Sequence, residues 1–213
     1  MTKLLNQYSI CVIDIGSPKL GNIGWCVYDA LHNKYYKGAD LLKLYPVLSS
    51  ICENNGLILG LEAPLFVPLR TDLLLATKAR KGEGRRPWSA GAGAQVLALN
   101  LPIMTHIFKN LLHLKPNLKF SFSADNFTAA TEEVMIFEAL VSGTDKGNTH
   151  IDDAEIMVNS CKKYLQKQLL PKNILETEIG VEYFNLAAAA LQRVGYKNHI
   201  QQLSSSLPIY KPD

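Results

Sequence analysis

Short apolar runs alternate with amphipathic stretches along this chain, and the alternation predicts a mixed α/β fold. Runs of aliphatic and β-branched residues predict buried strands, which we expect at residues 10–16, 24–28, 34–36, 57–62 and 133–138. Apolar residues three and four positions apart predict amphipathic helices, which we expect at residues 40–54, 94–114, 150–168 and 181–194. Pro102 falls inside the second of these helices, where it predicts a kink or a break.

The length and composition are those of a single globular domain. The chain has 213 residues, 47% of them hydrophobic, which is enough to bury a core. The sequence contains neither internal repeats nor a linker-like segment. We therefore expect one domain over residues 1–213, with an insertion at about residues 66–130.

Composition also argues against several classes of protein. The 4 cysteines lie far apart without a CxxC pair, which argues against a zinc site or a disulfide framework and favours buried, reduced thiols. The first residues lack the apolar core of a signal peptide, and no apolar stretch approaches the ~20 residues of a membrane span. There is no Gly-x-Ser-x-Gly motif, and the 5 histidines are dispersed. We expect a cytoplasmic protein with no membrane partner.

Acidic residues stand at comparable places in the expected elements. Asp14 lies within an apolar run, where a charge is unfavourable unless it is paired, protonated or bound to a metal. Glu62 and Glu138 end two later strands, and Asp152 and Asp153 open the helix that starts at residue 150. If these elements converge, their oxygen ligands suit Mg²⁺ or Mn²⁺. Two such ions, about 3.5–4 Å apart, can activate water and stabilise the leaving oxygen of a phosphodiester.

We expect the metal ligands and catalytic residues to be Asp14, Glu62, Glu138 and Asp153, with Asp152 as the substitute if the helix register differs by one. Local roles stay open for several of them. Asp14 can bond to the loop at Ser17, and acids in the first turn of a helix favour its macrodipole. His150 precedes the aspartate pair and can orient water or phosphate, although a structural role is the simpler interpretation.

A basic segment follows the strand that ends at Glu62. Residues 78–88 are rich in lysine and arginine and end in a tryptophan. Guanidinium groups suit phosphate, and an aromatic ring can stack on a base, although a charged run is often only a solvated loop. The expected substrate-binding residues, including one arginine just upstream, are Arg70, Arg80, Arg85, Arg86 and Trp88.

The expected order of elements resembles the ribonuclease H-like fold: three antiparallel strands, a helix, a parallel strand, a helical and basic insertion, another strand and a final helix. The chain is similar to a family of uncharacterised proteins described as predicted ribonuclease H-like nucleases. The motifs that carry the similarity are residues 12–16 with Gly24-Trp25, residues 62–68, Arg70, Asp72, Ala79-Arg80, residues 86–89, Phe137-Glu138 and Asp152-Asp153-Ala154. Glu62 stands where that family more often has aspartate.

The resemblance implies a metal-dependent nuclease, a hydrolase acting on RNA or DNA with Mg²⁺ or Mn²⁺, and a homodimer is left open. Two other functions use the same residues. The first is a non-catalytic ribonuclease H-like module that binds nucleic acid or serves in assembly. The second is a domain related to actin-like ATPases and sugar kinases, whose phosphate loop resembles Asp14, Gly16, Gly21 and Gly24.

Overall fold

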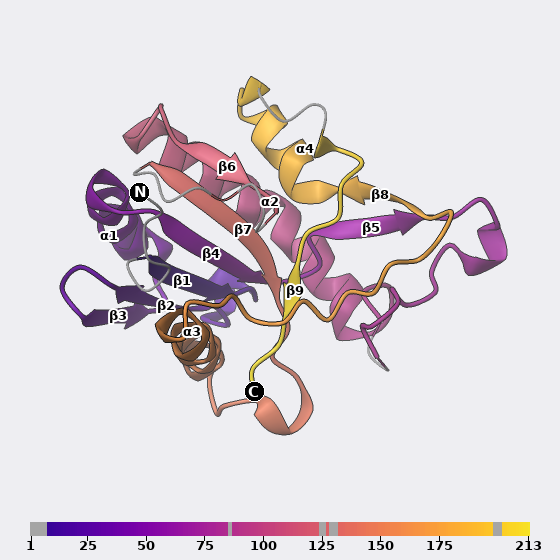
Figure 1. Ribbon diagram of the computed structural model, residues 1–213, viewed down its shortest axis with the longest axis horizontal. Coiled ribbons are helices and arrows are strands. Elements are labelled where there is room, and N and C mark those ends of the chain that lie inside the picture. The colour runs from indigo at the N-terminus through magenta and orange to yellow at the C-terminus, as the bar shows by residue number, and fades with distance from the viewer. Residues whose placement is uncertain (1–7, 85–86, 124–126, 128–131, 198–201) are drawn as a thin grey trace.

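The protein is built around one mixed β-sheet. The computed structural model describes residues 8–84, 87–123, 127, 132–197 and 202–213 (Figure 1). The sheet has seven strands in the order β3-β2-β1-β4-β7-β6, and β9 pairs with β7. The strands are β1 Ser9–Asp14, β2 Gly24–Asp29, β3 Lys34–Gly38, β4 Leu57–Glu62, β6 Lys119–Ser121, β7 Glu133–Ala139 and β9 Ile209–Tyr210.

Strand directions confirm the expected fold class. β1, β2 and β3 are antiparallel neighbours, whereas β4, β7, β6 and β9 join through parallel pairings. This mixed sheet flanked by helices is consistent with a ribonuclease H-like α/β fold. The segment between β4 and β7, where the sequence predicts an insertion, contains β5, α2 and β6.

Helices cover both faces of the sheet. Three of them, α1 (Leu41–Asn54), α2 (Ala92–Leu114) and α4 (Leu186–Arg193), contribute to one core with Cys11 and Ile13 of β1. On the opposite face, α3 (His150–Gln166) packs in a second core with Ile10 and Val12. Because successive strand residues point to opposite faces, β1 is apolar throughout and is buried on both sides.

The structure corrects two expectations about helices. α2 continues through Pro102 as one helix, so the alternative that Pro102 breaks the helix is wrong. The helix expected at residues 181–194 is instead strand β8 (Glu182–Asn185) followed by α4, whose first turn is capped by Asn185 through a 2.9 Å bond from the Ala188 N–H. β8 pairs with β5 (Phe66–Leu69) in a separate two-stranded sheet. Tyr183 and Phe184 therefore belong to a ribbon, which the helical spacing of nearby apolar residues conceals.

The cysteines behave as expected, since Cys11, Cys26, Cys52 and Cys161 are all buried and free. Burial raises the pKa of each thiol. Among the described residues, no helix is both long enough and apolar enough to cross a bilayer.

Candidate metal centre

Two carboxylates lie side by side where β1 and β4 end. The parallel register of these strands places Asp14 directly opposite Glu62. Both residues follow the alternation of Ile10, Val12 and Ile58, which face the core beneath α3. The two side chains therefore leave the sheet on the same face, toward the start of α3.

The third carboxylate comes from the first turn of α3. Thr149 caps this helix in a reciprocal capping box with Asp152. The helix approaches the sheet closely because Gly24, which pairs with Asp14 across the β1–β2 ladder, has no side chain: a Cβ there would lie 2.2 Å from the His150 carbonyl carbon. The next inward position after the capping box is Asp153, which is buried.

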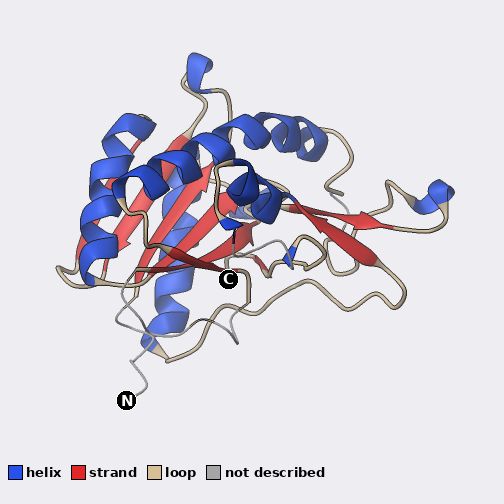
Figure 2. Cartoon of the chain, turned by 90° about the horizontal axis from the view of Figure 1, so that it is seen from above, coloured by secondary structure: helices blue, strands red, loops and turns tan. Residues whose placement is uncertain are grey.

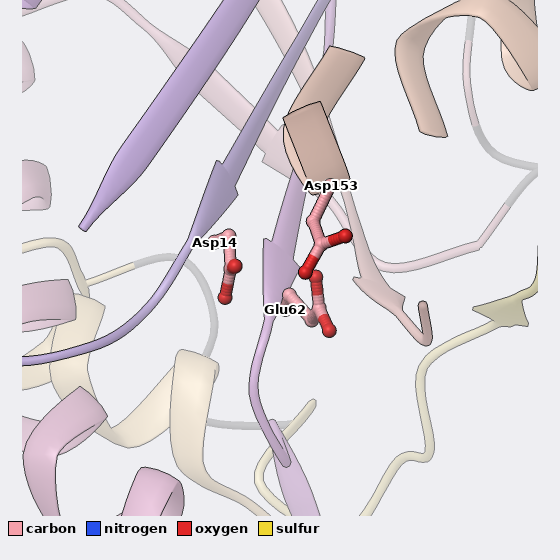
Figure 3. Close-up of side chains that lie close together, drawn as sticks. All are labelled: Asp14, Glu62 and Asp153. Atoms are coloured by element: carbon pink, nitrogen blue, oxygen red, sulfur yellow. The ribbon is translucent and has the colours of Figure 1, made fainter. Parts of the chain in front are cut away.

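These three carboxylates form one cluster (Figure 3). Asp14, Glu62 and Asp153 each offer a ligand oxygen, and these oxygens all lie within 4.8 Å of one another. Burial raises the pKa of Asp14 despite the opposing effects of His150 and Lys146. Burial and the neighbouring Asp14 raise the pKa of Glu62 to about 9. Two buried acids and a partly buried one this close together favour protonation or a bound cation.

The donor set fits a hard divalent cation. Within the described part of the chain, the Glu62 Oε2 atom is buried and has no hydrogen-bond partner. Such an atom is unfavourable unless it is protonated or binds a cation. Carboxylate oxygens are the ligands of Mg²⁺, Mn²⁺ and Ca²⁺, so the cluster can hold a metal ion.

Two side chains contact the cluster, Lys146 from the β7–α3 connection and His150 from the first residue of α3. Lys146 Nζ lies 3.1 Å from Asp153 Oδ2 and 3.7 Å from Glu62 Oε1, and the Gly147 N–H donates to Asp153 Oδ1 at 2.6 Å. Burial acts to lower the pKa of Lys146, but Glu62, Asp153 and Asp14 together raise it. His150 Nδ1 lies 2.5 Å from Asp14 Oδ2. The ammonium group of Lys146 thus supplies positive charge between two of the acids.

Glu138 does not join the cluster, contrary to the expectation that it is a ligand. The parallel register pairs Glu138 with Leu61, whose side chain faces the core opposite α3. On β7 the α3 face is taken instead by Phe137 and Ala139. Glu138 therefore emerges from the other side of the sheet, because adjacent strand positions alternate between faces.

Arg80 is buried against Glu138 and is not a surface group for substrate. Its guanidinium donates to the two Glu138 oxygens at 2.6 and 2.8 Å and to Glu83 Oε1 at 2.7 Å, and it stacks over the Phe66 ring. The expectation that Arg80 contacts substrate is therefore wrong. The buried carboxylates need this cation, so the pairing holds residues 80–83 against the sheet.

Arg70 is also committed to internal contacts. Its guanidinium forms two bonds with Glu178, at 3.1 and 3.0 Å, and donates to the carbonyls of Leu75, Lys78 and Ala79. Its side chain is only 4% exposed, so the expected substrate contact is wrong here too.

The other expected site residues have separate outcomes. Asp152 accepts from the Thr149 N–H at 3.0 Å and serves the helix cap, so it is not part of the carboxylate cluster. The indole of Trp88 donates to the Lys78 carbonyl at 3.3 Å. Arg85 and Arg86 lie outside the described residues.

Sequence reasoning missed Lys146 as a member of the site. The sequence gives only a weak indication of this role, because Lys146 is a single lysine in a polar, glycine-containing segment shortly before Asp152 and Asp153. Its role depends on the fold of the β7–α3 connection, where the short 3₁₀ turn η4 (Gly143–Asp145) directs the following residue toward the acids.

Comparison of the chain with models of protein families, with curated proteins and with solved structures finds no match. Interpretation of the site therefore depends on its own geometry and chemistry.

Proposed function

We propose that this protein is a divalent-metal-dependent nuclease that hydrolyses phosphodiester bonds of nucleic acid, with Mg²⁺ or Mn²⁺ held by Asp14, Glu62 and Asp153. The observation that supports the proposal best is the convergence of three carboxylates from β1, β4 and α3 at one end of a ribonuclease H-like sheet. The resemblance of the surrounding motifs to predicted nucleases of that fold is in agreement with it.

The carboxylates have a defined part in this function. Asp14 and Glu62 are positioned by strand register and Asp153 by a capped helix, so their relative geometry is set by regular elements. Asp14, Glu62 and Asp153 would hold the divalent ion, which would supply a Lewis acid that polarises a phosphodiester and makes water more acidic. The carboxylates supply the negative charge that retains the ion. The second core, which contains Val12 and Phe137, packs beneath them.

His150 and Lys146 act from the rim of the site. The imidazole holds Asp14 through Nδ1, which leaves Nε2 to exchange a proton with water or with a leaving oxygen. The His150 side chain is 37% exposed and the Lys146 side chain 43%, so solvent and substrate can reach both groups. Lys146 can place its ammonium against a phosphate oxygen of the substrate.

The test combines metal binding with cleavage. Purified protein is titrated with Mn²⁺ by calorimetry and is incubated with RNA, DNA, RNA–DNA hybrid and branched DNA, with EDTA as the blank. We expect Mn²⁺-dependent cleavage of at least one substrate, loss of both binding and cleavage in Asp14→Asn and Asp153→Asn, and retention of both in the matched control Asp152→Asn.

The alternatives predict different results. Nucleic-acid binding that needs no metal, without cleavage, would support the non-catalytic module. Metal-dependent ATP hydrolysis without cleavage would support the actin-like ATPase relationship. The nuclease proposal fails if no substrate is cleaved and Asp14→Asn leaves the Mn²⁺ affinity unchanged.

A further inference from the structure

The two-stranded sheet forms an arm that extends away from the main sheet. The arm consists of β5, β8 and the segments 70–79 and 176–181, which continue from their outer ends. Figures 1 and 2 both show it extending to one side of the molecule, with the 3₁₀ turn η3 (Leu73–Leu75) at its far end. A ribbon of two strands is marginally stable by itself, so its exposed surface needs an explanation.

The solvent-facing side of the ribbon exposes two large apolar side chains beside one charged residue. Register pairs Pro68 with Tyr183 on one face and places Leu69, Phe184 and Glu182 on the other. Leu69 and Phe184 are 49% and 40% exposed, and Glu182 is exposed as well. An antiparallel ribbon with one face in water normally carries mainly polar residues on that face, and here two of these three side chains are apolar.

The tip of the arm is more apolar still. Leu73, Leu74 and Ile179 are 84%, 92% and 97% exposed. They lie in two separate segments of the chain, which are held together by two hydrogen bonds between the Arg70 guanidinium and the Glu178 carboxylate. The same guanidinium also donates to the backbone carbonyls of Leu75, Lys78 and Ala79. The apolar tip is therefore part of an ordered structure.

Area and charge indicate what kind of partner fits. With Leu69, Leu75 and Phe184, the patch exposes the equivalent of about four large apolar side chains, or roughly 600 Å² at about 150 Å² each. A stable protein interface buries about 800 Å² per partner, and the largest apolar patch of a typical monomer, often a functional one, is about 300–600 Å², so the exposed apolar area of the arm lies at the upper end of that range. The charged residues of the arm are Asp72, Glu176, Glu178 and Glu182 against Arg70 and Lys78, and Arg70 is paired with Glu178. This excess of acids disfavours phosphate or an anionic lipid surface.

We propose that the arm is a dimerisation element, with the apolar surfaces of two copies of this chain packed against each other about a two-fold axis. A self-complementary patch is what such an isologous interface requires. The inference does not depend on the nuclease proposal.

The test measures the mass of the full chain by light scattering and sedimentation from about 1 to 100 µM, a range that brackets typical weak and moderate dimers. We expect a dimer for the wild type, a monomer for Leu74→Glu/Ile179→Glu, and a dimer for the control Leu20→Glu/Leu42→Glu. The control residues are 71% and 70% exposed and lie outside the arm. A monomeric wild type at every concentration, or equal dissociation of both double variants, overturns the inference.

A crosslinking experiment covers the case in which the glutamate variant fails to fold. All four native cysteines are buried, so a thiol introduced by Ile179→Cys is the reactive one. A short bismaleimide should link two chains of Ile179→Cys at least tenfold faster than chains of the control Leu20→Cys. Equal crosslinking rates for the two variants would contradict a dimer interface at the arm. The same conclusion would follow if the wild-type protein were monomeric and bound to neutral phosphatidylcholine vesicles.

Discussion

Replacing Glu62 with glutamine should stabilise the metal-free protein at neutral and alkaline pH. The folded pKa of Glu62 is about 9, because of burial and the neighbouring Asp14, whereas an unfolded glutamate titrates near about 4.3. Between these two pH values Glu62 holds a proton in the folded state and has lost it in the unfolded state. The contribution of Glu62 to the free energy of unfolding is therefore fully present below the unfolded pKa and is lost as the pH rises to the folded pKa. Each pH unit in that window lowers the free energy of unfolding by up to about 1.4 kcal/mol, and the loss by pH 7 is on the order of 3 kcal/mol. Glutamine removes this dependence.

Glu138→Gln is the matched control, because it is the same chemical change with the opposite expected sign. Both partners of the Glu138–Arg80 pair are buried, at 2.6 and 2.8 Å. Removing one charge from such a pair typically destabilises a protein by about 3–5 kcal/mol. Since Glu83 continues to pair with Arg80, we expect the lower end of that range, and no change in Mn²⁺ affinity.

The assay is urea unfolding, followed by circular dichroism from about pH 5 to pH 9, with EDTA and then with excess Mn²⁺. Relative to wild type, Glu62→Gln should gain only about 1 kcal/mol near pH 5 and several times more at pH 8 in EDTA, and should be no more stable when Mn²⁺ is added. Wild type should gain stability from Mn²⁺ because the ion binds only the folded state. The reasoning is refuted if Glu62→Gln is destabilised at pH 8 as strongly as Glu138→Gln.

Three further predictions follow from the contacts around the site. Asp153→Asn should abolish Mn²⁺ binding in calorimetry, whereas Asp152→Asn should lower stability by less than about 1 kcal/mol and leave the affinity unchanged, because only the capping box is affected. Gly24→Ala should lower the free energy of unfolding by about 1–3 kcal/mol and weaken Mn²⁺ binding, since its Cβ would displace the start of α3; intact affinity would show that the helix position is irrelevant. Lys146→Met should raise Mn²⁺ affinity by roughly tenfold, or about 1.4 kcal/mol, because the ammonium competes with the ion for Asp153; a fall in affinity would indicate that Lys146 supports the site instead.

The sequence by itself determined the features that depend on neighbouring residues. The apolar run around Asp14 predicts a buried strand that contains a charge, and the structure has both. The apolar spacing and the acids of its first turn predict a helix from about residue 150, and α3 begins at His150. The order of strands and helices was sufficient to predict a ribonuclease H-like sheet, because periodicity and capping act over a few positions of the chain.

Only the tertiary structure decided which acids meet. Glu62 and Glu138 both come at the expected ends of apolar strands, and nothing local distinguishes them. The difference is one position of alternation: Glu62 shares a face with Asp14, and Glu138 pairs with Leu61 on the other. The Arg80–Glu138 pair and the contact of Lys146 with Glu62 likewise join groups that are distant in sequence. Strand register and long-range ion pairs depend on how whole elements pack, and a pattern of neighbouring residues does not contain that information.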